Sequence, residues 1–504
     1  ALTPEQALRI AQGDSDERIA ALNAVVVAAD PALAAYVQAL LADEVKLGGG
    51  KALIVRGDQV TDAATGAAAV LPDDAEDVIN PNRMRRELEG ALAALQLFSP
   101  DRAVRLKAAA DLKDQADVGK LALFEKAEKT ETDPAIRTAL AMLKASALIN
   151  ADDKRQRIAA AQLLAGSDQP ATRSLLLERL AVEDDAEVKA ALNKTLATVS
   201  SRLAWGETLG LIFTGASLGS ILLLAALGLA ITYGLMGVIN MAHGELIMIG
   251  AYATYFVQSL FRAYLPGAFD AYILAAIPAS FLASALVGAA MERSVIRFLY
   301  GRPLETLLAT WGISLILMQS VRTLFGAQNV GVENPSWLSG GVQVLPNLVL
   351  PYNRLAILAF AALVLAGMAL LISRTRLGLF VRGVTQNRRM AACVGVNTAR
   401  VDTYAFALGA GIAGLAGCAL SQVGNVGPDL GQGYIVDSFM VVVLGGVGQI
   451  AGTVYAGLGL GLMNKLLEGW QGAVLAKIMV LVFIVIFIQK RPQGLFAVKG
   501  RSAE

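Results

Sequence analysis

The chain has 504 residues, of which 55% are hydrophobic and 17% charged, and its formal net charge is +1. A charge so close to zero argues against a nucleic-acid-binding role, which needs a basic face that displaces counterions. Cys393 and Cys418 both lie in the apolar half, and their spacing makes no metal motif, so we expect neither a metal site nor a disulfide in the other half.

Charge divides the chain into two parts. Residues 1–204 are rich in Ala, Leu, Asp, Glu, Lys and Arg, as in a soluble helical domain. From residue 208 to residue 261, Glu245 is the only Asp, Glu, Lys or Arg. Apolar runs of about 20 residues, the length that crosses a bilayer, follow one another in this half. We therefore predict a soluble domain over 1–204 and a polytopic membrane domain over 205–504.

The first residues, ALTPEQALRI, indicate the start of a helix, with Thr3 as its N-cap and Pro4 at its first position. The chain begins at Ala1 rather than at Met. A removed secretory signal is one explanation, and a shortened chain is the other. We expect the signal, because the topology below places this end outside the cytoplasm.

Residues 101–200 repeat with an offset of 52. DPAIRTAL at 133–140 aligns with DAEVKAAL at 185–192, and RLKAAADL at 105–112 aligns with RIAAAQLL at 157–164. Two matches at one offset predict stacked units of short amphipathic helices that break at Asp and Pro. Such units form an α-solenoid, here of the HEAT type.

A segment inside this domain departs from the helical pattern. KALIVRGDQVTDA at 51–63 has a β-rich run, a Gly-Asp turn and a second short run, which predict a small β-hairpin inserted in the array. The domain has no His, no Cys and no catalytic set of carboxylates. Solenoids usually bind other molecules, but this sequence does not indicate which.

The second half predicts an all-α membrane domain of about eight spans. Seven candidate spans occupy residues 208–236, 244–262, 271–291, 304–325, 352–373, 402–421 and 473–489. Residues 436–468 are too short for two full spans and a turn. Their central glycines predict two short helices that meet at an elbow lining a pathway, because broken helices at bilayer depth need protein or a cavity around them.

Positive charge sets the expected orientation. Residues 373–400 contain six Arg and no acid, whereas 326–350 and 422–437 carry acids only. Positive loops stay in the cytoplasm. Five spans precede the Arg-rich loop, so we expect the N-terminal domain outside the membrane and the C-terminus in the cytoplasm.

The apolar stretch GVINMAHGELIMI at 237–249 holds Asn240, Glu245 and His243, which is the only histidine. Polar groups at membrane depth are costly, and they are usually functional or mutually satisfied. Three interpretations stay open: helix capping, in which Asn240 ends one helix and Glu245 lies in the first turn of the next, a structural network beside a permeation route, and direct contact with a solute. A lone His is a poor metal site. The candidate pathway residues are Thr232, Tyr233, Asn240, His243, Glu245, Gly445, Gly446 and Gly448.

Four motifs in this half resemble a known family. They are GVINMAHGE at 237–245, LGLFVRGVTQNRRMAACVGVNTARV at 377–401, LGGVGQIAGTVYAGLGLG at 444–461 and RPQGLF at 491–496. They are similar to the permease subunits of branched-chain-amino-acid-type ABC importers, over about residues 207–498. A long helical extracytoplasmic domain ahead of the permease resembles the urea-importer branch.

The resemblance implies a permease that imports a small polar solute by alternating access, with urea as the main expectation and a branched-chain or other amino acid as the alternative. It implies a bacterial inner membrane location, a second homologous permease, two ATP-binding subunits that carry ATP and Mg, and a periplasmic solute-binding protein. The chain has no GxxxxGK[ST] phosphate loop, so we expect it to bind no cofactor and to catalyse no reaction.

The resemblance also implies a cytoplasmic helix that docks on the ATP-binding subunits. VTQNRRMAA at 384–392 suits this helix, and Gly395 could end it. A merely solvated loop is the alternative, against which the apolar Leu379, Phe380, Met390 and Val394 argue. The candidate coupling residues are Arg382, Gln386, Asn387, Arg388, Met390 and Gly395.

Other functional classes remain to be weighed against this one. A channel or secondary transporter would not need an Arg-rich coupling segment, and a membrane-tethered scaffold would not need glycine-broken helices at bilayer depth. The polar residues of the spans are mostly uncharged, such as Thr310 and Ser314, which fits a neutral solute slightly better than a zwitterion.

Overall fold

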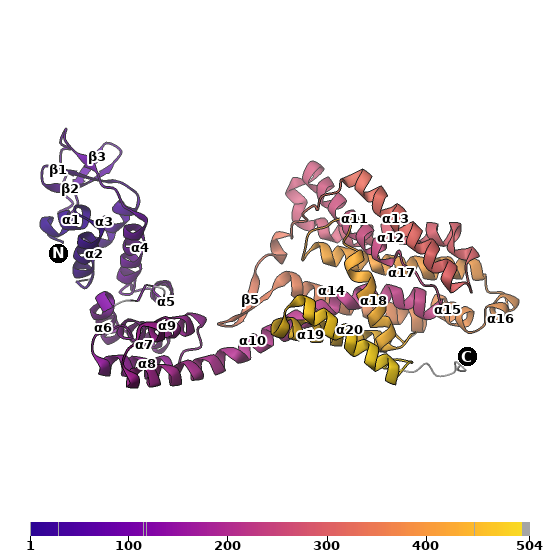
Figure 1. The fold of residues 1–504 in the computed structure, drawn as a ribbon. Coiled ribbons are helices and arrows are strands. Elements are labelled where there is room, and N and C mark those ends of the chain that lie inside the picture. Colours follow the sequence, from indigo (N-terminus) through magenta and orange to yellow (C-terminus); the bar gives the residue numbers. More distant parts are fainter. Residues whose placement is uncertain (1, 29, 114, 117, 448, 496–504) are drawn as a thin grey trace. The chain divides into compact units, whose positions relative to one another are not determined.

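The computed structural model describes residues 2–28, 30–113, 115–116, 118–447 and 449–495 (Figure 1). The chain divides into two compact units, residues 1–205 and residues 206–504, and each is described by itself. The boundary between the units falls within the 44-residue helix α10 (Ala186–Leu229).

The first unit begins with helices packed around apolar side chains. They are α1 (Pro4–Ala11), α2 (Ser15–Val26), α3 (Pro31–Leu41) and α4 (Asn82–Gln96). As predicted, Thr3 is the N-cap of α1: its hydroxyl accepts from the Gln6 N–H at 3.2 Å, and the Gln6 side chain accepts from the Thr3 N–H at 3.0 Å. The buried Tyr36 hydroxyl donates to Ala7 O at 2.6 Å and so joins α3 to α1.

The predicted hairpin is present within a larger sheet. Its strands are β2 (Lys51–Arg56) and β3 (Gln59–Asp62), and Gly57 in their turn has φ +62°, a conformation that favours glycine. Two further antiparallel strands, β1 (Val45–Gly48) and β4 (Glu76–Asp77), complete the order β3-β2-β1-β4. The sequence did not predict them, because strands of four and two residues carry too little alternating pattern.

Short helices follow the sheet. They are α5 (Arg102–Asp111), η1 (Val118–Lys120), α6 (Leu121–Thr130), α7 (Pro134–Leu148), α8 (Lys154–Leu164), α9 (Pro170–Val182) and the first part of α10. Asp101 and Asp133, which the sequence places at the breaks, act as N-caps that accept from backbone N–H groups of the following helix. At the next break the sequence pointed to Asp152, but the N-cap of α8 is its neighbour Asp153.

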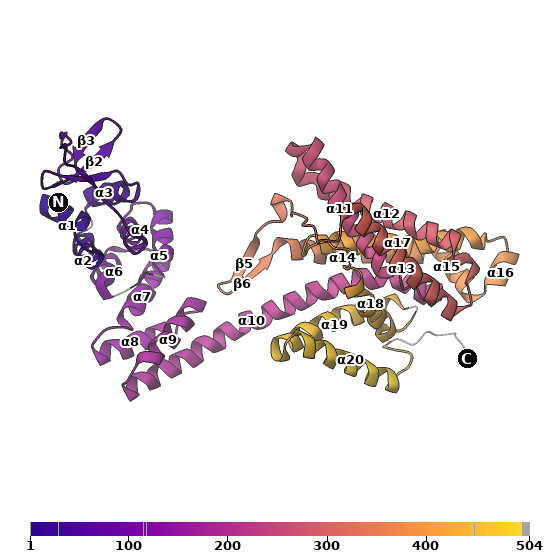
Figure 2. The same cartoon turned by 45° about the horizontal axis from the view of Figure 1, so that its top comes forward.

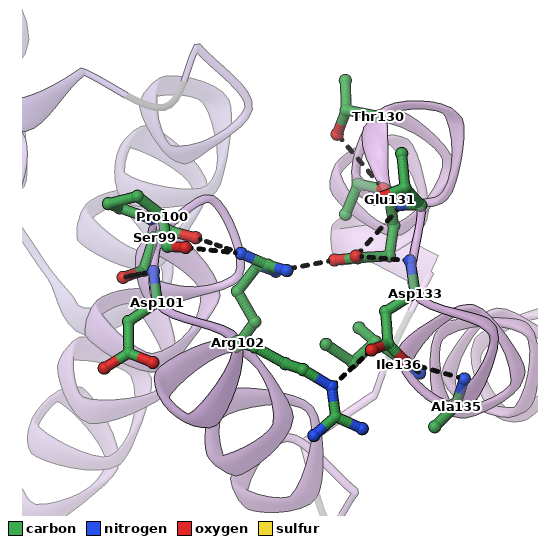
Figure 3. Close-up of polar contacts among 12 residues, drawn as sticks. Ser99, Pro100, Asp101, Arg102, Thr130, Glu131, Asp133, Ala135 and Ile136 are labelled. Atoms are coloured by element: carbon green, nitrogen blue, oxygen red, sulfur yellow. Dashed lines mark hydrogen bonds and ion pairs between the residues drawn. The ribbon is translucent and has the colours of Figure 1, made fainter.

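A set of polar contacts between these helices recurs with an offset of 52 residues. Figure 3 shows the first set around Arg102, Glu131 and Asp133. Arg105 Nε lies 2.9 Å from Glu131 Oε2, and Arg157 Nε lies 3.2 Å from Glu183 Oε2. The other ends of both guanidinium groups donate to carbonyl oxygens just before the helix that carries each arginine, those of Ser99 and Pro100 in one set and those of Ala151 and Asp152 in the other. The sequence repeat is therefore also a repeat of contacts.

The second unit confirms the predicted all-α polytopic fold. Its helices are the rest of α10, η2 (Ala230–Leu235), α11 (His243–Tyr264), η3 (Pro266–Ala271), α12 (Tyr272–Ser294), η4 (Ile296–Phe298), α13 (Pro303–Phe325), η5 (Ser336–Leu338), α14 (Tyr352–Arg374), α15 (Arg376–Gln386), α16 (Arg388–Cys393), α17 (Thr398–Ser421), α18 (Gln432–Gly445), α19 (Ile450–Gln471) and α20 (Ala473–Lys490). Seven helices in the described part of the chain are long and apolar enough to cross a membrane. An unpredicted hairpin, β5 (Gly341–Leu345) with β6 (Leu348–Pro351), lies between α13 and α14.

Burial separates the centre of this unit from its periphery. The apolar windows of α10 and α17 are 83% buried, whereas those of α14 and α20 are 22% and 17% buried. Helices α11, α12 and α17 lie side by side (Figure 2). Gly417 permits this close packing, because a Cβ there would lie 1.9 Å from Ile247 O. We interpret α14 and α20 as lipid-facing, since their exposed side chains are large and apolar.

Two helix predictions need correction. The predicted helix over 384–392 is two helices, because Asn387 is extended and its side chain accepts from Met390 N at 3.1 Å as the N-cap of α16. Asn favours this role over a helix interior. The predicted pair of short helices over 436–468 is one short helix, α18 with 14 residues, and one of crossing length, α19 with 22, because the pair begins earlier and ends later than predicted.

Candidate functional site

The link between α10 and α11 carries the polar residues that the sequence singled out. Helix α10 ends in the π-helical turn η2, a distortion frequent at functional sites. Gly237 follows with φ +74°, and α11 begins at His243. The capping interpretation of Asn240 is wrong, since the preceding helix has already ended at Leu235. Its side chain instead stabilises a turn within the link, because Oδ1 accepts from Ala242 N at 3.0 Å.

His243 joins the link to the centre of the helix bundle. Its Nε2 lies 2.6 Å from Ala225 O of α10, and its side chain is fully buried. A carbonyl only accepts, so Nε2 carries the proton and Nδ1 is an acceptor. Gly228 makes room for the ring, because a Cβ there would lie 2.9 Å from His243 Cε1.

Helix α13 holds the link from another side. The Thr310 hydroxyl accepts from Met241 N at 3.1 Å and donates to Thr306 O at 2.7 Å. Glu245 lies in the first turn of α11, as predicted, and is 2% exposed. The link is therefore fixed by hydrogen bonds to two neighbouring helices.

Three buried polar atoms of this link have no hydrogen-bond partner among the described residues: Asn240 Nδ2, His243 Nδ1 and Glu245 Oε1. Buried polar groups in proteins are nearly always paired, with protein or with water. Three such atoms within six positions are the chemical feature that sets this link apart. Together they offer one donor group, Asn240 Nδ2, and two acceptors, His243 Nδ1 and Glu245 Oε1.

The remaining predicted pathway residues lie elsewhere. Thr232 is buried against α17, where a Cβ on Gly409 would lie 2.9 Å from its methyl group. The Tyr233 ring stacks edge-on with Phe439 of α18 at 5.8 Å between centroids. Within the described part of the chain, no hydrogen bond joins either residue to His243, so the structure does not bring all the candidates into one cluster.

The glycine elbow joins α18 to α19. A Cβ on Gly445 would lie 2.3 Å from Gly452 C, and Gly446 has φ +97°. The segment after α20 returns to this elbow, where Leu495 N donates to Leu444 O at 2.8 Å. Close backbone packing therefore accounts for Gly445, and the positive φ accounts for Gly446. Gly448 lies outside the described residues.

The Arg-rich segment forms α15 and α16 and exposes apolar side chains. Leu379, Met390 and Val394 are 59%, 59% and 72% exposed. Arg382, Gln386 and Asn387 are exposed as well, and Gly395 follows α16 with φ +95°. Arg388 is turned inwards and forms an ion pair with Asp402 of α17. The sequence did not single out Asp402, although an acid at the start of an apolar run was a visible signal.

Comparisons with known proteins cover the membrane unit. Residues 211–488 match the family described as branched-chain amino acid transport system / permease component. The chain is 29% identical over 290 residues to the high-affinity branched-chain amino acid transport system permease protein BraD of Pseudomonas aeruginosa, and 28% identical over 294 residues to LivH of Escherichia coli. Each alignment covers 56% of this chain and 94% of the relative.

A more distant relative is the probable branched-chain amino acid transport permease protein LivH of Methanocaldococcus jannaschii, 26% identical over 318 residues, with 58% of this chain and 94% of the relative covered. No solved structure matches the chain. The family match spans more than half of the chain and runs from α10 into α20. The chain therefore belongs to the family of branched-chain amino acid transport system permease components.

Proposed function

We propose that this chain is the translocating subunit of an ABC importer in the bacterial inner membrane. The observation that carries the proposal is the family match, which covers nearly the whole membrane unit. ATP and Mg are then bound by two partner subunits, a second homologous permease completes the membrane part, and a soluble protein delivers the solute from outside. Alternating access follows when ATP-driven motion rocks the membrane helices.

The coupling segment supports this division of labour. Helices α15 and α16 contain Arg side chains beside exposed Leu379, Met390 and Val394. Large exposed apolar side chains mark interaction surfaces. An ATP-binding subunit that docks here would cover these side chains and pair with exposed Arg382.

The solute has two candidates. The relatives carry the words branched-chain amino acid transport in their names, and they favour a branched-chain amino acid as the solute of this chain. Urea is the second candidate, because it is neutral and has one carbonyl and two NH2 groups. The unpartnered donor of Asn240 suits the carbonyl, and the acceptors of His243 and Glu245 suit the NH2 groups. The alignments to these relatives cover little more than half of this chain, so they say nothing of the solenoid-like first unit, which we propose to be a HEAT-type array in the periplasm.

Uptake of labelled leucine and labelled urea tests the solute. Cells that carry all partner subunits are compared with and without this chain. Loss of leucine uptake alone establishes the amino acid, and loss of urea uptake alone establishes urea. Unchanged uptake of both solutes contradicts both candidates.

The two native cysteines test the orientation. Cys393, the last residue of α16, is exposed, whereas Cys418 in α17 is buried. A thiol reagent that cannot cross membranes should therefore label Cys393 in inside-out vesicles and not in right-side-out vesicles. Labelling from the periplasmic side would place the coupling segment outside and contradict the proposal.

A further inference from the structure

Two buried carboxylates lie at the ends of α12 and α17, outside the polar link described above. Glu292 is 1% exposed and Asp402 is 5% exposed. Carboxylates are rarely buried unless they are paired or hydrogen-bonded. Their partners are Arg388 of the coupling segment, Tyr300 of the turn between α12 and α13, and Thr403 of α17.

Asp402 is held by the coupling segment itself. The guanidinium group of Arg388, the first residue of α16, forms a short ion pair with the Asp402 carboxylate. The same guanidinium lies over the Tyr300 ring, with Cζ 4.4 Å from the centroid. Arg388 thus binds one charge and one aromatic face at the same time.

The network continues from Tyr300 to the membrane helices. The Tyr300 hydroxyl donates to Glu292 Oε1 at 3.3 Å, and the Thr403 hydroxyl donates to Glu292 Oε2 at 2.6 Å. Burial raises the pKa of Tyr300, so the phenol stays protonated and remains a donor. One chain of contacts therefore joins α16 to α12 and α17.

A second attachment joins the coupling segment to α10. The Thr385 hydroxyl of α15 donates to Leu235 O, the last residue of η2. The coupling segment is thus hydrogen-bonded or ion-paired to the ends of the most buried helices of the unit, α10 and α17.

A pocket lies between these attachments. A cavity of about 220 Å³ is lined by Leu235, Met236, Tyr300, Thr385, Arg388 and Asp402, among others. Close-packed interiors resist displacement, because a small gap already loses much of the dispersion attraction. Polar contacts around a cavity can keep two elements connected while these elements shift, which is the property of a joint.

A buried ion pair is weak evidence for stability, because desolvation offsets most of the Coulomb attraction. Its better-attested role is to fix how two packed elements align with each other. We propose that Arg388, Tyr300, Asp402 and Glu292 form the joint that transmits motion of the coupling segment to α12 and α17, an inference that rests on the proposed importer function. Asp402 and Tyr300 lie outside α15 and α16, so they can be altered without changing the exposed apolar side chains of the surface proposed to dock on the ATP-binding subunits.

The test uses the complete importer in proteoliposomes, with uptake and ATP hydrolysis measured on the same sample. Asp402→Asn removes the charge and keeps the size, Tyr300→Phe keeps the ring and removes the hydroxyl, and Arg388→Asp with Asp402→Arg exchanges the pair. Arg322→Gln is the control for an exposed ion pair, because Arg322 pairs with Asp429 at 3.0 Å and the two side chains are 36% and 68% exposed.

We expect Asp402→Asn to bind the ATP-binding subunits normally and to lower solute transported per ATP by about tenfold, as for coupled residues in contact. The exchanged pair should recover most of that loss, Tyr300→Phe should lose less, and Arg322→Gln should match the wild type. The joint is disproved if Asp402→Asn and Tyr300→Phe both transport normally per ATP.

Equal loss of subunit binding and of uptake would also overturn the joint, because the network would then only hold the docking surface in place. Tyr300→Phe keeps the inference testable if Asp402→Asn fails to fold, since it removes one hydroxyl only. Failure of the wild-type protein to bind any ATP-binding subunit would instead contradict the proposed function.

Discussion

Two buried carboxylates, one in each unit, differ in how completely they are paired. Glu183 of the first unit accepts from the N–H groups of Asp184 and Asp185 at 3.2 and 3.1 Å, and it pairs with Arg157 and Arg179. Glu245 of the second unit is as deeply buried, yet its Oε1 has no partner among the described residues. Both carboxylate oxygens of Glu183 are therefore paired, whereas Glu245 leaves hydrogen-bonding capacity for something else.

The comparison extends beyond single residues. Glu131 repeats the arrangement of Glu183 in the preceding helices, with two backbone donors and Arg105. In the membrane unit, Asn240 and His243 share the incompleteness of Glu245. We therefore expect substitutions in the first unit to change stability, and substitutions in the link or the coupling segment to change transport.

The largest effect on uptake is expected at the coupling segment. Arg382→Glu or Met390→Asp should block uptake, by about a hundredfold or more, because a wrong charge in a protein interface costs several kcal/mol. Immunoblots of membranes should show normal amounts of both variants. Leu163→Asp is the control, since Leu163 is 51% exposed in the first unit. Normal uptake by the Arg382 and Met390 variants would remove the coupling assignment.

The polar link should give the next largest effect. Glu245→Gln or His243→Gln keeps size and some hydrogen bonding, and each should lower uptake by about tenfold if a solute group loses a partner worth 1–3 kcal/mol. Uptake is measured across pH, with the amount of folded protein determined in parallel. If uptake and its pH dependence are unchanged in His243→Gln, this residue serves the structure alone.

Removal of a completely paired acid should act on stability. Glu183→Ala leaves Arg157, Arg179 and two backbone donors unpaired, and it should destabilise the first unit by about 3 kcal/mol. Urea denaturation of residues 1–205 measures this, while uptake per folded molecule should stay normal. Glu5→Ala, which removes an exposed pair with Arg9, should cost only about 0.3 kcal/mol. Equal effects of the two variants would contradict the comparison.

The smallest effect is expected from pH. Burial alone would raise the pKa of Glu183, but the N–H of Asp185 and the guanidinium groups of Arg179 and Arg157 outweigh it and lower the pKa. A lowered folded-state pKa adds stability above the usual carboxyl pKa of about 4, and this stability is lost as pH falls through the lowered value. The urea concentration at the unfolding midpoint of residues 1–205 should therefore decrease as the pH is lowered below about 4. In Glu183→Gln this decrease should be smaller. A midpoint that rises as pH falls would contradict a lowered pKa of Glu183.

The membrane helices are the part of the fold that composition predicted best. The predicted span 352–373 is Tyr352–Arg374, and 473–489 is Ala473–Lys490. Long apolar runs bounded by charge leave few alternatives, because lipid requires every backbone group to be paired within the helix. Local side-chain chemistry was harder to predict: Asn387 splits one predicted helix, and the strands of both sheets are short.

The sequence by itself determined which residues could carry function, since an isolated Glu245 in an apolar run or an apolar Met390 in the Arg-rich segment departs from its surroundings in the chain. Only the tertiary structure decided which of them are satisfied. His243 meets Ala225 across 18 positions, and Glu292 meets Thr403 across 111. The physical reason is that a hydrogen bond depends on the position of two atoms within a few tenths of an ångström, and packing between helices fixes that position, whereas hydrophobic patterning does not.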